Sequence, residues 1–188
     1  MKAKTLAAAC LAGAAAAVLA GCTHAPTTPS NKDDGAFAYF LDRKATWTEN
    51  KVDKLPPLPS EASLLSFDVS QNTPLAFSVD AKSIDVGSDG VVRYTIVVTS
   101  PAGARNVNYE GIRCDTYEWR QYAGLNATHD GWDRSVATDW SRIENGDLNA
   151  YQAALYQDYF CASKMAAAPA KMIIENIRLR RTAASMEH

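Results

Sequence analysis

The feature that most restricts the fold is a period of two in the hydrophobicity of the middle of the chain. Apolar and polar residues alternate in Leu65–Val69 and again in Leu75–Val79, as they do in strands with one buried face. The run Val91–Thr99 is rich in β-branched residues and is the longest strand pattern. Two further strand patterns follow it, at Asn106–Arg113 and Thr116–Ala123.

Short turn sequences join these segments. The sequence Gly87-Ser88-Asp89-Gly90 lies between Ser83–Val86 and the long strand, and its Asp-Gly pair supplies the positive φ that a tight hairpin needs. A second turn, Ser100–Gly103, leads into the next strand. Antiparallel neighbours joined by short loops predict a β-meander. Gly111, inside a strand pattern, indicates a bulge or close packing.

The C-terminal part of the chain has a helical period instead. A capping-box pattern at residues 149–152 opens a helix that we expect to continue to about residue 160. Tyr151, Leu155 and Tyr159 share one face of this helix, which should pack against the sheet. A second helix is expected over residues 170–182. The predicted fold class is α+β, an antiparallel β-meander sheet packed against one or two C-terminal helices.

The start of the chain has the pattern of a bacterial lipobox. Lys2 and Lys4 are followed by an uninterrupted apolar stretch, Thr5–Leu19, and then by Ala20-Gly21-Cys22. A transmembrane anchor is the alternative, but a spanning helix needs roughly 20 apolar residues and this run has about 15. We therefore predict a lipoprotein signal peptide over residues 1–21, with Cys22 as the lipid-attachment residue.

Acylation of Cys22 implies membrane lipid as a partner and the bacterial cell envelope as the location. Thr23 stands where an aspartate would favour the inner membrane, so we expect an outer-membrane protein that faces the periplasm.

The other predicted parts are a tether with a short apolar segment over residues 22–50, a single α+β domain over 51–163, and a helical tail over 164–188. Leu55–Pro59 should lie extended along a surface. A proline-rich ligand for a partner domain is the alternative interpretation of that segment.

The cysteine count also indicates an oxidising compartment. Cys10 lies in the predicted signal peptide and Cys22 is the predicted lipid-attachment residue. Cys114 and Cys161 therefore remain as one possible pair. We expect a disulfide between them, with a closed loop of about 47 residues that stabilises the fold by roughly 4 kcal/mol in the chain-entropy model. Two buried thiols are the alternative.

Charge and motifs exclude some classes of partner. Lys2 and Lys4 account for two of the 19 basic residues, so the 21 acidic residues outnumber the basic ones in the rest of the chain, which disfavours nucleic acid as a partner. The cluster His129–Asp133 has one histidine and two carboxylates in a glycine-containing segment, and we interpret it as a polar loop rather than a metal site. No cofactor is predicted.

Several strings in the predicted domain resemble a known family. They are Leu55-Pro56, Phe67-Asp68-Val69, Phe77-Ser78-Val79-Asp80, Gly90-Val91-Val92-Arg93-Tyr94-Thr95, Tyr109-Glu110-Gly111-Ile112-Arg113-Cys114, Trp140 and Asp158-Tyr159-Phe160-Cys161. Together they resemble the CNP1-like family of bacterial proteins over roughly residues 47–161. The resemblance implies an envelope protein, often a lipoprotein, and brings no activity, cofactor or catalytic residue to this chain. The stretch after Ser163 is expected to lie outside the shared part.

The most site-like polar group consists of charged residues inside strand patterns. Arg93, Glu110 and Arg113 are expected on neighbouring strands, where surface ion pairing is one interpretation. The other is a pocket for a small anionic ligand or a glycan, with aromatic side chains as platforms. The candidate platforms are Tyr117, Trp119, Tyr122, Trp132 and Trp140.

Anchor, tether and compact sheet together favour a non-enzymatic module that binds or scaffolds another envelope component. A domain that binds a small ligand or a cell-wall glycan is the alternative. An envelope hydrolase that uses carboxylates such as Glu110, Asp115 or Glu118 is a third possibility. The common catalytic motifs are missing from the sequence, so no catalytic residue is predicted.

Overall fold

A computed structural model describes residues 47–69, 73–144 and 150–182. The predicted signal peptide, the lipid-attachment residue Cys22, most of the tether and the first residue of the capping box lie outside the described residues. Among the described segments, no helix is long and apolar enough to cross a bilayer.

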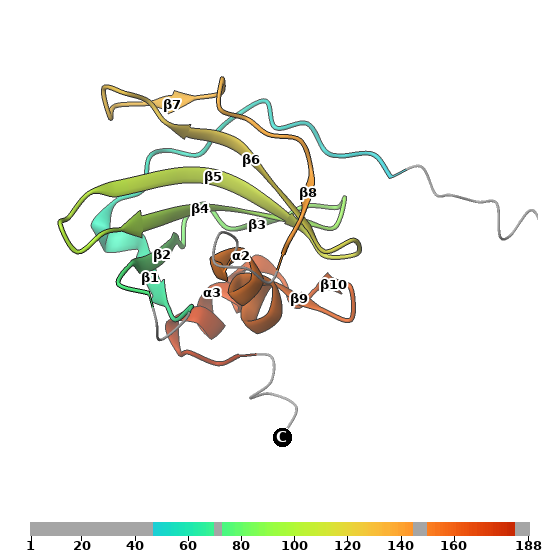
Figure 1. The fold of residues 1–188 in the computed structure, drawn as a ribbon. Helices are drawn as coiled ribbons and strands as arrows, with labels where there is room; N and C mark the ends of the chain where they lie inside the picture. Colours follow the sequence, from blue (N-terminus) through green and yellow to red (C-terminus); the bar gives the residue numbers. More distant parts are fainter. Residues whose placement is uncertain (1–46, 70–72, 145–149, 183–188) are drawn as a thin grey trace, which may run out of the picture. The chain divides into compact units, whose positions relative to one another are not determined.

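The strands form an eight-stranded antiparallel sheet (Figure 1), which confirms the predicted meander. Its spatial order is β1-β2-β4-β5-β6-β7, while β3 pairs with β4 and β8 pairs with β6. The strand bounds are β1 Leu64–Phe67, β2 Ala76–Asp80, β3 Asp85–Val86, β4 Val91–Thr99, β5 Arg105–Arg113, β6 Glu118–Leu125, β7 Trp132–Asp133 and β8 Ser141–Arg142. A 3₁₀ turn, η1 (Glu61–Ser63), precedes β1.

The hairpin β4–β5 forms the centre of the sheet. Its register runs without interruption from Val91 opposite Arg113 to Thr99 opposite Arg105. Gly103, in the turn that joins the two strands, has a φ of 83°. Gly90, in the turn between β3 and β4, has a φ of 77°, as the Asp-Gly pattern predicts.

Strand β6 begins two residues later than the alternation predicts and carries a bulge. The register against β5 shifts between Tyr109 and Glu110, so that Tyr122 is the additional residue of β6. The bulge brings the Tyr122 ring over Gly111, where an added Cβ would lie 2.8 Å from the tyrosine hydroxyl and 2.9 Å from Val91. The glycine therefore lies where two side chains approach the backbone, which confirms the prediction of close packing.

The remaining elements cover one face of the sheet (Figure 1). The predicted first helix consists of α2 (Ala150–Leu155) and a π-helical turn, η3 (Tyr156–Phe160). A small hairpin of β9 (Cys161–Ala162) and β10 (Met165–Ala166) follows, and then α3 (Ala170–Arg178). Leu155 and Tyr159 are buried in the core and Tyr151 packs against it, so the predicted stripe faces the sheet.

The helix after residue 163 is part of the same body. Ile173 and Ile177, one helical turn apart on α3, are buried in the same core as Phe67 and Leu155. The helix predicted within residues 164–188 is thus one of the helices that pack against the sheet, because this isoleucine pair covers the sheet edge at β1. The helix also ends at Arg178 rather than at residue 182.

A disulfide joins the two layers. Cys114 directly follows β5 and Cys161 directly follows η3, and their Cα atoms are 5.5 Å apart. Both cysteines are buried in the core. The predicted cystine is confirmed, and it links the helical segment to the central hairpin.

Replacing both cysteines, Cys114→Ala with Cys161→Ala, should lower the free energy of unfolding by about 4 kcal/mol, since the unfolded chain loses a closed loop of 47 residues. Urea unfolding followed by far-ultraviolet circular dichroism measures the change. A loss below about 1 kcal/mol would show that the link contributes little to stability.

Candidate functional site

The two faces of the sheet have different chemistry because side chains alternate along the central strands. Tyr94 lies opposite Glu110 in the register, on the face that the helices cover. Arg93 lies opposite Gly111, and Arg113 lies opposite Val91, on the other face. The structure therefore separates the predicted trio: it keeps Arg93 and Arg113 on one face and places Glu110 on the opposite one.

Residues 47–59, which we call the strap, run along the face that bears the arginines (Figure 1). No residue of the strap belongs to a strand. At its start the Trp47 indole donates to the Asp89 carbonyl over 2.8 Å, and the backbone N–H of Asn50 donates to the Asp89 carboxylate over 2.8 Å. The strap is thus bound to the turn between β3 and β4.

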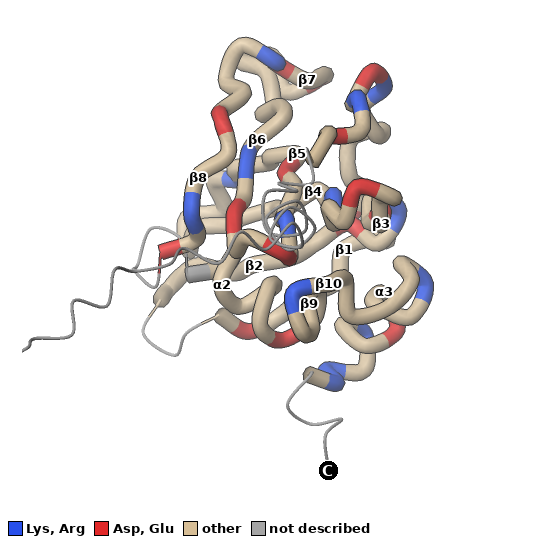
Figure 2. Tube along the Cα trace, turned by 90° about the vertical axis from the view of Figure 1, so that its right-hand side faces the viewer, with Lys and Arg blue, Asp and Glu red and all other residues tan. Residues whose placement is uncertain are grey.

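The carboxylate of Glu49, in the strap, accepts hydrogen bonds from three side chains of the folded body and forms an ion pair with a fourth. The Tyr122 hydroxyl donates over 2.7 Å, Arg120 Nη1 over 2.9 Å and the Trp140 indole over 3.1 Å. Arg93 Nη2 lies 3.9 Å away as an ion pair. Basic and acidic positions are interspersed on β6 and its neighbours in Figure 2. The three donors and the ion-paired guanidinium form a site that fits one carboxylate.

Arg93 is the most deeply buried of these charges, with 4% of its surface exposed. Its two terminal nitrogens donate to Asp89 over 3.1 and 2.6 Å, and Nη2 also donates to the Asn50 carbonyl over 3.3 Å. Burial raises the pKa of Asp89, but the hydrogen bonds from Arg93 and from the backbone N–H of Asn50 outweigh it and hold the pKa below its ordinary value. This carboxylate is therefore ionised at neutral pH and compensates the buried guanidinium.

Arg113 is also paired. Its guanidinium carbon lies 3.8 Å from the centre of the Trp47 ring, and Nη2 donates to Asp115 over 2.7 Å. The Trp47 ring meets Trp140 edge to face at 5.7 Å. An anionic ligand at these arginines would have to displace a carboxylate of the chain.

The later part of the strap is held through its backbone. Arg134 donates to the carbonyls of Val52 and Asp53, over 3.0 Å each. The Trp132 indole donates to the Pro56 carbonyl over 2.7 Å. Side chains of the folded body therefore recognise the extended proline segment much as they would recognise a bound peptide.

The five candidate aromatic platforms divide between the two faces. Tyr122, Trp132 and Trp140 contact the strap. Tyr117 meets Tyr156 edge to face at 4.5 Å, and Trp119 packs against the core. Three of the five aromatics therefore belong to the strap site, and two serve the helix-facing core.

Glu110 is fully buried under the helices. Its carboxyl accepts hydrogen bonds from Tyr94 over 2.9 Å and from Tyr151 over 2.7 Å, and the Asn108 amide lies at 3.5 Å. Burial raises its pKa to about 7, although the bonds from Tyr151, Tyr94, Asn108 and Gln152 partly lower it. Glu110 therefore joins β5 to α2 and titrates near neutral pH.

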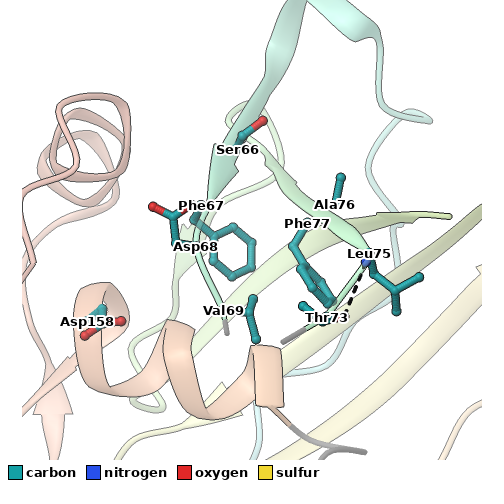
Figure 3. Close-up of a pocket in the computed structure, with 9 residues that line it drawn as sticks. All are labelled: Ser66, Phe67, Asp68, Val69, Thr73, Leu75, Ala76, Phe77 and Asp158. Atoms are coloured by element: carbon teal, nitrogen blue, oxygen red, sulfur yellow. Dashed lines mark hydrogen bonds between the residues drawn. The ribbon is translucent and has the colours of Figure 1, made fainter. Parts of the chain in front are cut away.

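An open pocket of about 650 Å³ lies where β1 and β2 meet η3. Figure 3 shows the Phe67 and Phe77 rings turned toward each other, with Asp158 on the neighbouring helical segment. Burial raises the pKa of Asp158, whereas Asp68 pairs with Arg180 at 2.6 Å. The full lining is Ser66, Phe67, Asp68, Val69, Thr73, Leu75, Ala76, Phe77 and Asp158.

Among the residues that the structure describes, no group of three or more His, Cys, Asp and Glu side chains could hold a metal ion. His129 lies in the loop between β6 and β7, where Asp130 accepts hydrogen bonds from Asn126 and Thr128.

Fold and site together define a two-layer α+β domain, with helices on one face of the sheet and an ion-paired strap on the other. The chain belongs to the CNP1-like family, whose model matches residues 42–178. The match includes α3 and therefore corrects the expectation that the shared part ends near Cys161. No curated protein and no solved structure matches the chain.

Glu49 and Trp47 are the functional candidates that sequence reasoning missed, because both fall within the predicted tether. A tryptophan in an otherwise polar segment is a signal for contact with a folded surface, since exposed tryptophans are uncommon. Nothing local to Glu49 indicates that three hydrogen-bond donors and a guanidinium converge on its side chain.

The buried Glu110 should make stability depend on pH. Its pKa is about 7 in the folded chain, against an ordinary value of 4.5. Between these values the folded state keeps a proton that the unfolded state has lost, so the free energy of unfolding should fall as pH rises from about 4.5 to 7, by up to about 3 kcal/mol.

Glu110→Gln should remove this contribution, so the free energy of unfolding of the variant should change less with pH between about 4.5 and 7. Urea unfolding at a series of pH values measures it, with Glu175→Gln, on an exposed part of α3, as the control. Equal slopes for Glu110→Gln and the unmodified chain would contradict the assignment.

Proposed function

We propose that this protein is a lipid-anchored protein of the bacterial cell envelope whose folded body is a non-enzymatic binding or scaffolding module. In this proposal Cys22 carries the lipid, the anchor lies in the outer membrane, and the body faces the periplasm. The lipobox pattern at residues 19–22 supports the anchor.

The observation that carries the proposal is the buried cystine Cys114–Cys161 downstream of the lipobox. Disulfides of this structural kind form and persist in oxidising compartments such as the periplasm. The leader pattern and the cystine lie far apart in the chain and support the same location independently.

The contacts of the three candidate catalytic carboxylates favour a binding module over a hydrolase. Asp115 and Glu118 lie 2.7 and 3.8 Å from Arg113 nitrogens, and Glu110 is enclosed by tyrosine hydroxyls under the helices. Each carboxylate that the sequence offers as a catalytic acid thus has a structural partner.

A small-ligand or cell-wall glycan domain is the second candidate, and the pocket in Figure 3 favours it. Its lining combines the apolar Phe67, Phe77 and Leu75 with the carboxylates of Asp68 and Asp158, a mixture suited to an uncharged polar ligand. Titration with uncharged N-acetylglucosamine oligosaccharides, monitored by amide chemical shifts, tests this candidate. Shifts confined to the pocket would favour it over scaffolding.

Cys22→Ala should move the protein from the membrane fraction to the soluble fraction and abolish incorporation of an alkyne-palmitate label, because the thiol that accepts the lipid is gone. Cell fractionation and gel fluorescence measure both effects. Cys10→Ala, in the apolar stretch, is the matched control and should retain label and location. An unlabelled natural chain, or a Cys22→Ala chain that stays membrane-bound, would refute the anchor.

A further inference from the structure

We propose that the face of the sheet under the strap is a receptor site for an extended peptide that combines a glutamate with a proline-rich stretch. The strap occupies this site as the chain's own ligand, and the partner is a segment of the same chemistry on another protein chain. The inference rests on the proposed binding function and names the class of partner.

The first support is the carboxylate site around Glu49. The donors Arg120, Tyr122 and Trp140 and the ion-paired Arg93 all belong to the sheet or its loops, whereas the carboxylate comes from the strap. Charged and aromatic donors around one carboxylate are a strong, directional recognition element. A carboxylate from another chain would find the same three donors and the same guanidinium if the strap left.

The second support is the way the strap backbone is bound. Arg93, Arg134 and Trp132 donate to strap carbonyls, and no strap residue takes part in a sheet ladder. An indole that donates to a carbonyl beside prolines is the means by which aromatic grooves hold polyproline segments. The proline-rich segment at residues 55–59 is thus a ligand whose receptor lies in the same chain.

The third support is the connectivity of the strap. Its polar contacts join residues that are 38 to 91 positions apart in the sequence, while only the link at residue 60 ties it covalently to the described body. Such a segment competes with an outside peptide at an effective concentration of the order of millimolar. Weakening the contacts between the strap and the sheet should therefore open the site to a peptide added in solution.

The test uses a fluorescent synthetic peptide with the sequence of residues 47–59, titrated into the full chain purified in detergent, with anisotropy as the readout. Glu49→Gln in the chain should tighten peptide binding roughly tenfold relative to the natural chain, because the internal competitor loses its charged hydrogen bonds. Adding Arg120→Gln to that variant should remove most of the gain.

Two matched controls accompany the titration. A peptide with glutamine at the position of Glu49 should bind the Glu49→Gln chain roughly tenfold more weakly than the natural peptide does. Glu61→Gln, which breaks an exposed pair with Arg105 outside the strap, should leave the affinity at the natural level.

Failure of the peptide to saturate the folded Glu49→Gln chain at 1 mM, or equal binding of both peptides, would overturn the proposal. If that variant does not fold, the natural chain at several millimolar peptide provides the second measurement. With a nitroxide spin label on each peptide, the Trp132 and Trp140 indole N–H resonances of the chain should then broaden with the natural peptide and not with the glutamine peptide, and unbroadened resonances would overturn the proposal. Palmitate labelling is independent of these results, so a failed peptide test leaves the anchor proposal intact.

Discussion

The register of β4 against β5 is the constraint on which the other features depend. Because Tyr94 pairs with Glu110 and Arg93 with Gly111, the hairpin places Tyr94 and Glu110 under the helices and the guanidiniums of Arg93 and Arg113 on the other face. A slip of one residue would exchange the faces, bury arginines under the helices and expose the core. The cystine at the end of β5, the helices and the strap all take their positions from this pairing.

Charge compensation on the second face follows from that assignment. Buried guanidiniums are tolerated when carboxylates and hydrogen-bond acceptors meet them, and Asp89 and Glu49 provide these for Arg93 and Arg120. The strap thus supplies part of the charge that the sheet requires. The same arrangement explains how a segment with no strand pairing stays ordered on the sheet, and why a chemically similar segment could take its place.

Local patterns predict most of the sheet and little of the site. The period of two, the Asp89-Gly90 turn and the stripe through Leu155 are properties of neighbouring residues, and the structure confirms them. The bulge at Tyr122, the opposite faces of Arg93 and Glu110, and the docking of α3 depend on tertiary packing, which periodicity alone does not encode. Glu49 lies 71 positions from Arg120, so no local rule could link the two.

The cystine has a consequence for the integrity of the chain. Cys114 and Cys161 enclose β6, β7, β8, α2 and η3 within one covalent ring. A protease that cuts a single peptide bond inside that ring leaves both fragments attached to each other. After such a cut in a protease-rich compartment, the disulfide would still fasten Cys161 to the central hairpin, and a second cut inside the ring would release only the piece between the two cuts.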